Sequence, residues 1–162
     1  MNIRVGFGFD VHQLKENIDF WIGGIKVPHF KGGCGHSDGD VLIHAICDAL
    51  LGAANLGDIG KHFPDTDQCF KGIDSKILLA SVMQLIRKEG YQIGNIDTTI
   101  CLQTPKIGPH ISEMRKVLSV CMGIDQDLIS IKATTTEKLG FVGREEGVSA
   151  YAIVLIDKNL KS

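Results

Sequence analysis

Apolar and small residues alternate at the start of the chain, over residues 3–11. Successive side chains of a strand face opposite sides of a sheet, so this pattern predicts a strand with glycines on one face, where another element can pack close to the backbone. Two apolar runs, 20–22 and 25–27, flank Gly23-Gly24, a turn signal that predicts a hairpin. The glycine-rich segment 30–38 is predicted as a loop.

Three stretches carry the apolar spacing of helices: residues 41–54, 77–86 and 111–121. The first is apolar on nearly every side, which predicts a buried helix, and Ser37 with Asp40 fits a capping box in front of it. The other two carry one apolar stripe each. Asp74-Ser75 is the expected N-terminal cap of the second helix, while Gly90 and Gly123 are expected to end the second and third helices.

The remaining apolar stretches predict strands at 91–102, 129–133 and 148–156. With the first strand they predict an α+β fold, with a mixed four-stranded main sheet, helices on one of its faces and a small hairpin. The other face needs cover too, since Phe7 and Phe9 alternate with glycines in the first strand. We therefore expect identical sheets to pack against each other in a closed oligomer.

Charge and cysteine content narrow the class of protein. The chain has 17 Lys and Arg against 19 Asp and Glu, a formal net charge of −2, so it lacks the basic footprint of a nucleic-acid binder. No apolar run approaches the length of a membrane span, and no signal peptide is recognisable. Five dispersed cysteines without a C-x-x-C pair indicate free thiols. These features predict a soluble cytoplasmic protein, and they leave open an organellar form that has lost its transit peptide.

Asp10 and His12 stand two residues apart at the end of the first predicted strand and therefore face the same side. His44 lies in the first predicted helix. One carboxylate and two imidazoles would make a three-ligand zinc site with an open fourth position, as in catalytic zinc centres. Asp48, one helical turn after His44, would orient an imidazole or be a surface acid. Alternatively, Asp10 caps a turn and both histidines are ordinary hydrogen-bonded groups.

Several polar segments suit a phosphorylated substrate. His36 and Ser37 precede the first helix, whose free backbone N–H groups attract phosphate, or Ser37 and Asp38 are only caps. The Thr-Thr-Thr-Glu run at 134–137 suits phosphate oxygens and a hard cation such as Mg²⁺, or opens a short helix as a capping box. The acidic loop 58–67 would accept sugar hydroxyls, or is simple turn chemistry.

Lys106 and Arg144 each lie near Gly or Pro and would meet phosphates or be plain surface charges. The chain lacks both G-x-x-x-x-G-K-[ST] and a complete G-x-G-x-x-G, which disfavours an ATPase and a nicotinamide dehydrogenase. An anionic ligand would therefore be held by metals, helix N-termini and individual side chains.

Five motifs together resemble one family. In chain order they are Gly6-Phe-Gly-Phe-Asp10-Val-His12, Gly35-His-Ser-Asp-Gly-Asp-Val-Leu-Ile-His44-Ala, Asp58-Ile-Gly, Phe63-Pro-Asp-Thr-Asp67 and Lys132-Ala-Thr-Thr-Thr-Glu137-Lys-Leu-Gly-Phe141. The sequence resembles the 2-C-methyl-D-erythritol 2,4-cyclodiphosphate synthases over almost its whole length. Two places depart from the family pattern: Ile107-Gly108, and Glu145 beside Arg144.

The resemblance implies a single catalytic domain over residues 1–162, assembled as a homotrimer with sheets facing the central axis and active sites between subunits. The substrate would be 4-diphosphocytidyl-2-C-methyl-D-erythritol 2-phosphate of the non-mevalonate isoprenoid route, and the products the cyclic diphosphate and CMP. Asp10, His12 and His44 would hold a divalent metal, usually zinc. Glu137 would hold Mg²⁺ or Mn²⁺ between the substrate phosphates.

The resemblance also assigns roles to individual residues. His36 and Thr135 would stabilise the charge that develops during transfer, and the stretch 102–108 would take the cytidine from the adjacent subunit. The full set expected to contact substrate is Asp10, His12, His36, Ser37, Asp58, Ile59, Gly60, Phe63, Pro64, Asp65, Thr66, Asp67, Leu102, Gln103, Thr104, Pro105, Lys106, Ile107, Gly108, Thr134, Thr135, Thr136, Glu137, Phe141 and Arg144.

Two rival hypotheses use the same residues. In a metal-dependent phosphohydrolase, zinc would activate water. In a non-catalytic trimeric scaffold, the metal would serve folding only.

Overall fold

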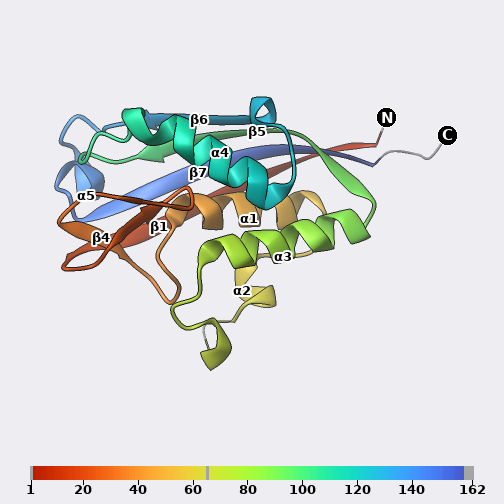
Figure 1. Ribbon diagram of the computed structural model, residues 1–162, viewed down its shortest axis with the longest axis horizontal. Coiled ribbons are helices and arrows are strands. Elements are labelled where there is room, and N and C mark those ends of the chain that lie inside the picture. The colour runs from red at the N-terminus through yellow and green to blue at the C-terminus, as the bar shows by residue number, and fades with distance from the viewer. Residues whose placement is uncertain (1, 65, 159–162) are drawn as a thin grey trace.

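The main sheet has five strands in the order β4-β1-β7-β5-β6, in a computed structural model that describes residues 2–64 and 66–158 (Figure 1). The strands are β1 (Ile3–Glu16), β4 (Lys31–Cys34), β5 (Tyr91–Cys101), β6 (Ile129–Thr134) and β7 (Gly147–Lys158). Neighbouring strands are antiparallel except β5 and β6, which are parallel. A separate hairpin of β2 (Phe20–Ile22) and β3 (Ile25–Val27) confirms the expected two-residue turn.

The prediction of a four-stranded main sheet is wrong, because the glycine-rich segment holds a fifth strand. The strand β4 pairs with the end of β1, which continues to Glu16 rather than ending near Val11. A side chain at Gly32 would lie 2.2 Å from the carbonyl oxygen of Asp19, so glycine is required there by close packing. Glycines normally weaken a strand signal, which is why the composition of this edge strand predicted a loop.

The helices are α1 (Val41–Ala53), α2 (Ile59–His62), α3 (Ser75–Lys88), α4 (Ile111–Met122) and α5 (Gly140–Gly143), with 3₁₀ turns η1 (Gln68–Phe70), η2 (Gly108–His110) and η3 (Gln126–Leu128). The helix α1 lies directly on β1 and β7 and is buried along most of its length. A Cβ at Gly6 or Gly8 would lie 1.9 Å from the carbonyl oxygen of Ala49 or Ala45. The glycines of β1 therefore set how closely α1 approaches the sheet.

The predicted capping box before α1 is wrong in its first member. Asp40, not Ser37, is the N-cap, and its carboxylate accepts a hydrogen bond from the backbone N–H of Ile43. The same carboxylate accepts from the N–H groups of Gly23 and Gly24 at 3.0 and 2.6 Å. Burial raises the pKa of Asp40 even though these N–H groups favour its charged form. The residue thus joins the start of α1 to the β2–β3 turn.

Three other predicted helix ends are confirmed, and one predicted helix start is wrong. Asp74 is the N-cap of α3, and Gly90 and Gly123 follow α3 and α4 in the left-handed conformation, as expected. The capping box predicted over 134–137 opens no helix, because α5 begins only at Gly140.

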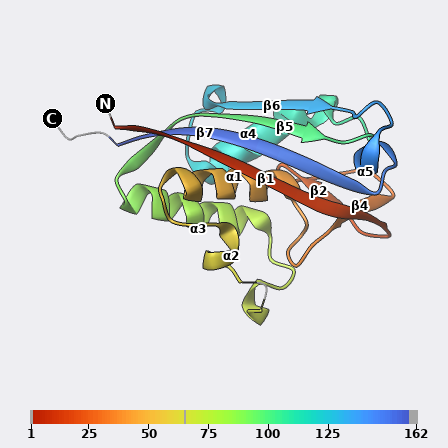
Figure 2. The ribbon, with the colours of Figure 1, turned by 180° about the vertical axis from the view of Figure 1, so that it is seen from behind.

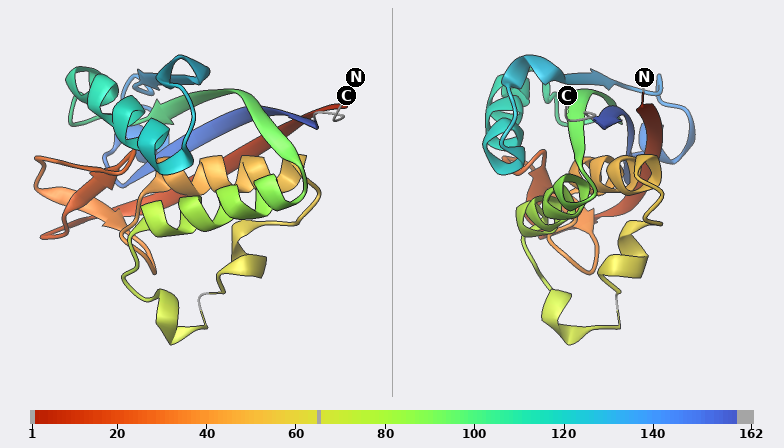
Figure 3. Two further views of the ribbon diagram at one scale, coloured as in Figure 1. Left: turned by 45° about the vertical axis from the view of Figure 1, so that its right-hand side comes forward. Right: turned by 90° about the vertical axis from the view of Figure 1, so that its right-hand side faces the viewer.

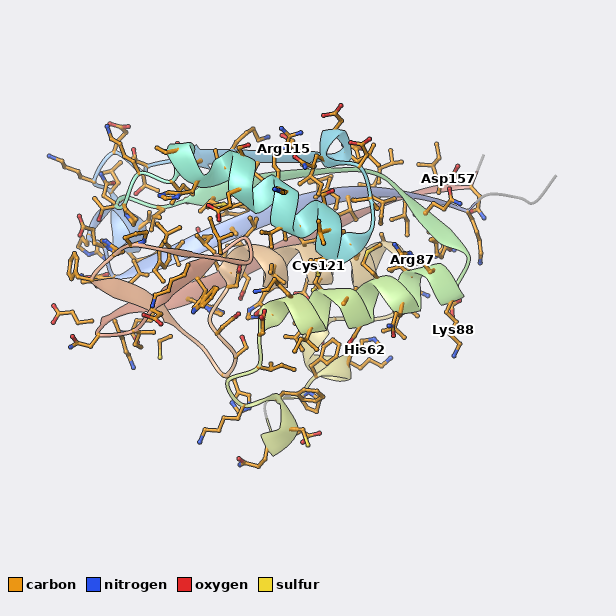
Figure 4. All side chains as sticks on the ribbon, viewed as in Figure 1. His62, Arg87, Lys88, Arg115, Cys121 and Asp157 are labelled. Atoms are coloured by element: carbon orange, nitrogen blue, oxygen red, sulfur yellow. The ribbon has the colours of Figure 1, made fainter. Side chains whose placement is uncertain are left out.

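Side-chain contacts to backbone carbonyls hold α3 and α4 together. Arg87 donates to the carbonyl of Met122 at 2.6 Å, and the thiol of Cys121 lies 3.2 Å from the carbonyl oxygen of Lys76 (Figure 4). The segment with α2 and η1 extends away from the sheet beyond these helices (Figure 3). In the ranges that are described, no helix is both long and apolar enough to cross a bilayer.

One face of the sheet carries a band of exposed apolar side chains. In Figure 2 the strands β1 and β7, which hold these residues, run in front of the helices. We call it the apolar band: Ile3, Val5, Phe7, Phe9, Val11, Tyr151 and Ile153. Val5 and Phe7 are 65% and 64% exposed, and the rings of Phe9 and Tyr151 lie 5.0 Å apart. A contiguous apolar patch of this kind marks an interaction surface.

Candidate metal centre and substrate site

Asp10, His12 and His44 meet at one point, as the strand spacing predicts. Alternation along β1 turns Asp10 and His12 to the helix side of the sheet, and α1 brings His44 over them. Asp10 Oδ2 lies 3.0 Å from both His12 Nε2 and His44 Nδ1, and the two nitrogens are 3.3 Å apart. Tetrahedral ligands about 2.0–2.1 Å from one Zn²⁺ are about 3.3 Å from each other. The three donor atoms therefore have the chemistry and the spacing of a divalent metal site.

The environment shifts the pKa values of the two imidazoles in opposite directions. Burial lowers the pKa of His12, and the charge of Asp10 only partly offsets it. Burial also opposes the charged form of His44, but its hydrogen bond to Asp10 and the nearby carboxylates outweigh burial and raise its pKa. A divalent cation would replace protons at this cluster, because it binds the neutral imidazoles.

Asp48 has a role that neither sequence interpretation anticipated. Its carboxylate accepts a hydrogen bond from the backbone N–H of Ile59 at 2.8 Å, while no hydrogen bond to His44 is found in the described chain. Burial raises the pKa of Asp48, and the Ile59 N–H partly offsets that shift. Asp48 therefore fixes the start of α2 against α1 and is not the group that orients the imidazole.

The groups that contact the far nitrogen of His44 come from other segments. Ser37 Oγ and Ser75 Oγ lie 3.0 and 2.9 Å from His44 Nε2, and Ser75 is held in turn by Asp38. The sequence predicts Ser75 only as part of a helix cap, because nothing in its local pattern indicates that α3 begins beside α1.

A pocket of about 330 Å³ opens beside the three-ligand cluster. Of the expected site residues, it is lined by Asp10, His12, His36, Ser37, His44, Ile59, Gly60 and Phe63. Cys34, Phe70, Ile73 and Leu78 line it as well and were not expected. They come from the unrecognised edge strand, from η1 and from the entry to α3, so their proximity arises only in the folded chain.

The loop 58–67 is only partly drawn into this pocket. Asp58 is the N-cap of α2, accepting from the N–H of Lys61, and Asp67 accepts from the N–H of Cys69. These carboxylates therefore perform the turn role that the sequence left open. Pro64 and Thr66 do not line the pocket, and Asp65 lies outside the described residues.

A second pocket, of about 310 Å³, lies where β5 and β6 end. Of the expected residues, it is lined by Leu102, Gln103, Pro105, Lys106, Ile107, Gly108, Thr134 and Thr135. The N–H of Leu102 donates to the carbonyl of Thr134 at 3.0 Å, which holds the two segments together. Thr104 precedes Pro105 through a cis peptide bond, and Ile107 is buried at the base.

The segment after β6 is exposed and locally strained. Thr135 donates to the carboxylate of Glu137 at 3.0 Å, and Thr136 donates to the carbonyl of Leu139 at 2.6 Å. Glu137 and Lys138 both adopt positive φ angles, 53° and 64°, which non-glycine residues rarely do. Strained backbone of this kind is concentrated at functional sites. The Glu137 carboxylate is thus presented to solvent by a defined loop.

Arg144 is engaged differently from either sequence interpretation. Its guanidinium donates to both oxygens of Glu146, at 3.0 Å each, and this pairing raises the pKa of Arg144. Glu146, rather than the adjacent Glu145, is therefore the acid that pairs with Arg144. Phe141 is 41% exposed, close to the turn into β7.

The two pockets have no lining residue in common. Asp10 pairs with Ala150, Ala150 with Ile100, and Ile100 with Ala133, so Asp10 in the middle of β1 and the end of β6 lie in one row, three strand spacings apart. That is about 14 Å between backbones. The structure brings together the metal cluster with His36 and Ser37, but it leaves Thr135 and Glu137 after β6, at the far edge of the sheet from β4.

Known proteins match this chain over nearly its full length. The model of the YgbB family matches residues 3–157. The 2-C-methyl-D-erythritol 2,4-cyclodiphosphate synthase of Bacteroides fragilis is 66% identical over 158 residues, which covers 98% of this chain and 99% of the relative. The synthase of Porphyromonas gingivalis is 62% identical over 153 residues, 94% of each chain.

Solved structures agree with the fold. A 2C-methyl-D-erythritol-2,4-cyclodiphosphate synthase in a CDP-bound form has a TM-score of 0.88 at 38% identity, covering 95% of this chain and 100% of that one. The bifunctional IspDF of Campylobacter jejuni has a TM-score of 0.92 at 42% identity over 95% of this chain, which spans 42% of the bifunctional chain. With identities this high over nearly the whole sequence, the chain belongs to the YgbB family, whose matched relatives are 2-C-methyl-D-erythritol 2,4-cyclodiphosphate synthases.

Proposed function

We propose that this chain is a phosphorus–oxygen lyase of the non-mevalonate isoprenoid route. It converts 4-diphosphocytidyl-2-C-methyl-D-erythritol 2-phosphate to 2-C-methyl-D-erythritol 2,4-cyclodiphosphate and releases CMP. The observation that carries the proposal is the three-ligand cluster beside an open pocket, in a chain 66% identical to a curated synthase. A metal held by three protein ligands keeps a position open for substrate, as catalytic centres do.

The reaction makes specific demands on the protein. The 2-phosphate of the substrate attacks its own β-phosphorus, and the bond to CMP breaks. Because the nucleophile is already an anion, no strong protein base is needed, but negative groups must be brought together. When bound, a divalent metal at Asp10, His12 and His44, with zinc as our choice, and Mg²⁺ or Mn²⁺ at Glu137 would neutralise that charge.

The chain's own side chains supply the remaining stabilisation. His36 Nε2 is buried and without a hydrogen-bond partner in the described chain, so it is free to donate to a phosphate oxygen. Ser37 lines the same pocket, and Thr135 lines the second pocket, from which we propose it acts on the site of a neighbouring subunit. Such donors stabilise the charge that develops during transfer. Holding the substrate folded gives the attack an effective molarity on the order of 10⁵ M or more.

We propose that the pocket at the ends of β5 and β6 binds the cytidine, and that it does so for the metal centre of a neighbouring subunit. The separation of the two pockets within one chain supports this arrangement. The apolar band supports a homotrimer in which the sheets face a central axis, because it needs cover that no helix of the described chain provides. All five cysteines are free thiols, which favours the cytoplasm.

Turnover in ¹⁸O-labelled water tests the proposal directly. The purified protein would be loaded with Zn²⁺ and Mg²⁺ and given the cytidyl substrate, and the products followed by ³¹P NMR and mass spectrometry. A cyclic diphosphate without solvent oxygen, formed together with CMP, is the expected result. Label in a product phosphate would instead establish a phosphohydrolase. If the metal-loaded protein leaves the substrate intact, the metal has a structural role only.

A further inference from the structure

The two histidines of the metal cluster differ in what their far nitrogens contact. His12 Nδ1 is buried and has no hydrogen-bond partner in the described chain. His44 Nε2 instead lies 2.9 Å from Ser75 Oγ, at the first position of α3. Ser75 is fully buried, although its side chain is polar. A buried hydroxyl placed against an imidazole needs a reason, since burying it costs free energy unless it is hydrogen-bonded.

Asp38 fixes which way the Ser75 hydroxyl points. Its Oδ2 accepts from the backbone N–H of Ser75 at 3.0 Å, and its Oδ1 accepts from the Ser75 hydroxyl at 2.5 Å. The hydroxyl proton is therefore committed to the carboxylate. Only a lone pair of Ser75 Oγ remains for His44, so the imidazole must donate its Nε2–H to Ser75. A neutral imidazole with its proton on Nε2 has a free lone pair on Nδ1, the atom that faces Asp10 and His12.

We propose that Asp38 and Ser75 are positioning residues for the metal centre, acting through His44. They select the tautomer that can bind a metal through Nδ1 and hold the ring at the angle that α1 alone does not fix. This inference rests on the proposed metal site and adds a hydrogen-bonded chain, from Asp38 through Ser75 to His44, that joins the loop before α1 to the start of α3. Ligand histidines commonly donate their second N–H to such a partner, and losing it weakens metal binding about 10–100-fold.

Ser37 is the competing partner and explains why Ser75 is the informative residue. Ser37 Oγ also lies 3.0 Å from His44 Nε2, but its other contacts are long ones, 3.4 Å from the backbone nitrogen of Gly39 and 3.4 Å from Ser75 Oγ. No carboxylate contact fixes its proton, so Ser37 can rotate to serve a phosphate. Ser75 has its proton fixed by Asp38 and its nitrogen fixed in the first turn of α3.

The test measures metal affinity rather than turnover. Metal-free wild type, Ser75→Ala, Ser75→Thr and Asp38→Asn would be titrated with Zn²⁺ against a chromophoric chelator at one neutral pH. We expect about 10–100-fold weaker binding for Ser75→Ala and Asp38→Asn, with recovery in Ser75→Thr, which keeps the hydroxyl. Ser81→Ala is the matched control, because it removes from the same helix a hydroxyl that, among the described residues, donates to the carbonyl of Ile77.

A second readout separates positioning from general damage. In ¹⁵N-labelled, zinc-loaded wild type, NMR of the His44 ring should show a protonated Nε2 and a metal-bound Nδ1. In Asp38→Asn the Nε2 proton should exchange with solvent faster than in wild type. Zinc affinity within twofold of wild type in both Ser75→Ala and Asp38→Asn would overturn the positioning role. If Ser75→Ala does not fold, the isosteric Asp38→Asn decides alone. If the wild type itself does not bind Zn²⁺, that result would instead contradict the metal site and with it the proposed function.

Discussion

The two pockets of this chain are built in different ways. At the metal cluster, three donor atoms from β1 and α1 already lie within 3.3 Å of one another, on two mostly buried imidazoles and a carboxylate. At the end of β6, Thr135 and Glu137 are exposed, and their polar contacts are to residues within a few positions in the sequence. One half of the site is preorganised by packing, while the other is a strained loop that faces solvent.

The difference shows what each half needs. We call Asp10, His12 and His44 the metal half, and Thr135 with Glu137 the loop half. The metal half is complete within one chain because α1 rests on the glycines of β1 and cannot shift without a steric clash. The loop half contains the right groups, but it lies about 14 Å away across the sheet. In the shared site that we propose, the substrate would therefore use the metal cluster of one copy and the loop of another. The following predictions test the metal half, the combination of the two halves from different subunits, and the packing of α1 on the sheet.

Removing a ligand from the preorganised half should have the largest effect. In His44→Ala, turnover should fall on the order of 10³-fold or more, because the charge that the metal neutralises is left uncompensated. Folding should change little, since the ring is replaced beside an open pocket. Stopped assays of CMP release and a thermal melt measure the two effects. His110→Ala, a histidine remote from the cluster, is the control; equal losses of turnover in the two variants would contradict the assignment.

Mixing two inactive variants tests whether one site takes its two halves from different subunits. His44→Ala lacks the metal half, and Glu137→Gln lacks the loop half. If each site combines the metal half of one subunit with the loop half of another, unfolding and refolding an equal mixture should restore about one quarter of wild-type activity. Activity is again measured by CMP release. If both halves of a site come from one chain, no mixture of these two variants will recover activity.

Phe7→Glu in the same mixture serves as the control for assembly. Phe7 is 64% exposed within the apolar band, so a charge there should keep subunits apart while leaving the metal cluster of each chain intact. Light scattering should then report a smaller particle, and the restored activity should disappear. Recovery of activity by the separated subunits would count against a shared site.

The close approach of α1 to the sheet supports the preorganised half and should have a smaller effect on stability. Gly8→Ala places a Cβ 1.9 Å from the carbonyl oxygen of Ala45, one residue after His44. Such overpacking costs about 1–3 kcal/mol in the free energy of unfolding, and it should also weaken zinc binding by displacing the helix. Urea unfolding and a zinc titration measure both.

Gly52→Ala is the matched control on α1. Nothing lies within 4 Å of the added Cβ, and the position is helical, so alanine should stabilise the protein by about 0.5–1 kcal/mol. The two substitutions are chemically identical and should act with opposite sign. A Gly8→Ala protein as stable as wild type would show that α1 can shift, and that the metal half is less rigid than its packing indicates.

The two halves also differ in how far the sequence predicts them. Asp10 and His12 could be placed together because a strand fixes the direction of neighbouring side chains, and the helical character of 41–54 placed His44 on a buried element. The partners of the imidazole could not, since Ser75 and Asp38 meet only through the packing of α3 against α1. The same limit applies to Asp48, whose partner Ile59 begins the short helix α2 in a stretch that the sequence predicts as a loop.

Composition misled where glycine has a packing role. Residues 31–34 carry two glycines and gave a loop signal, yet they pair as an edge strand and line the metal pocket through Cys34. The Thr-Thr-Thr-Glu run gave a helix-cap signal, yet its backbone turns left-handed at Glu137. In both places a non-local requirement overrides the local preference, which a pattern within one segment does not contain.

The smallest predicted effect lies beneath the loop half, in an ion pair on β5 and β6. Lys132 Nζ donates to Asp97 at 2.6 Å, and this bond lowers the pKa of the Asp97 carboxyl below its ordinary value. A carboxyl with a lowered folded pKa stabilises the protein above its unfolded pKa of 3.8, and this stabilisation is lost as the pH falls further. Since both side chains are largely exposed, the contribution should be only about 0.2–1 kcal/mol.

Urea unfolding of metal-free wild type and Asp97→Asn measures the contribution of this ion pair to the free energy of unfolding. Metal-free protein is used because loss of metal would otherwise dominate the change in stability at acid pH. The variant should be less stable than wild type at neutral pH, and the difference should shrink as the pH falls below 3.8 and the wild-type carboxyl takes up its proton. Adding salt at neutral pH should shrink it too, as it does for exposed ion pairs. A difference that persists unchanged in acid would assign the stabilisation to hydrogen bonds that the amide retains. Zinc affinity should be the same in both proteins, since Asp97 and Lys132 lie two and three strands from β1 and the metal cluster is held by its own packing.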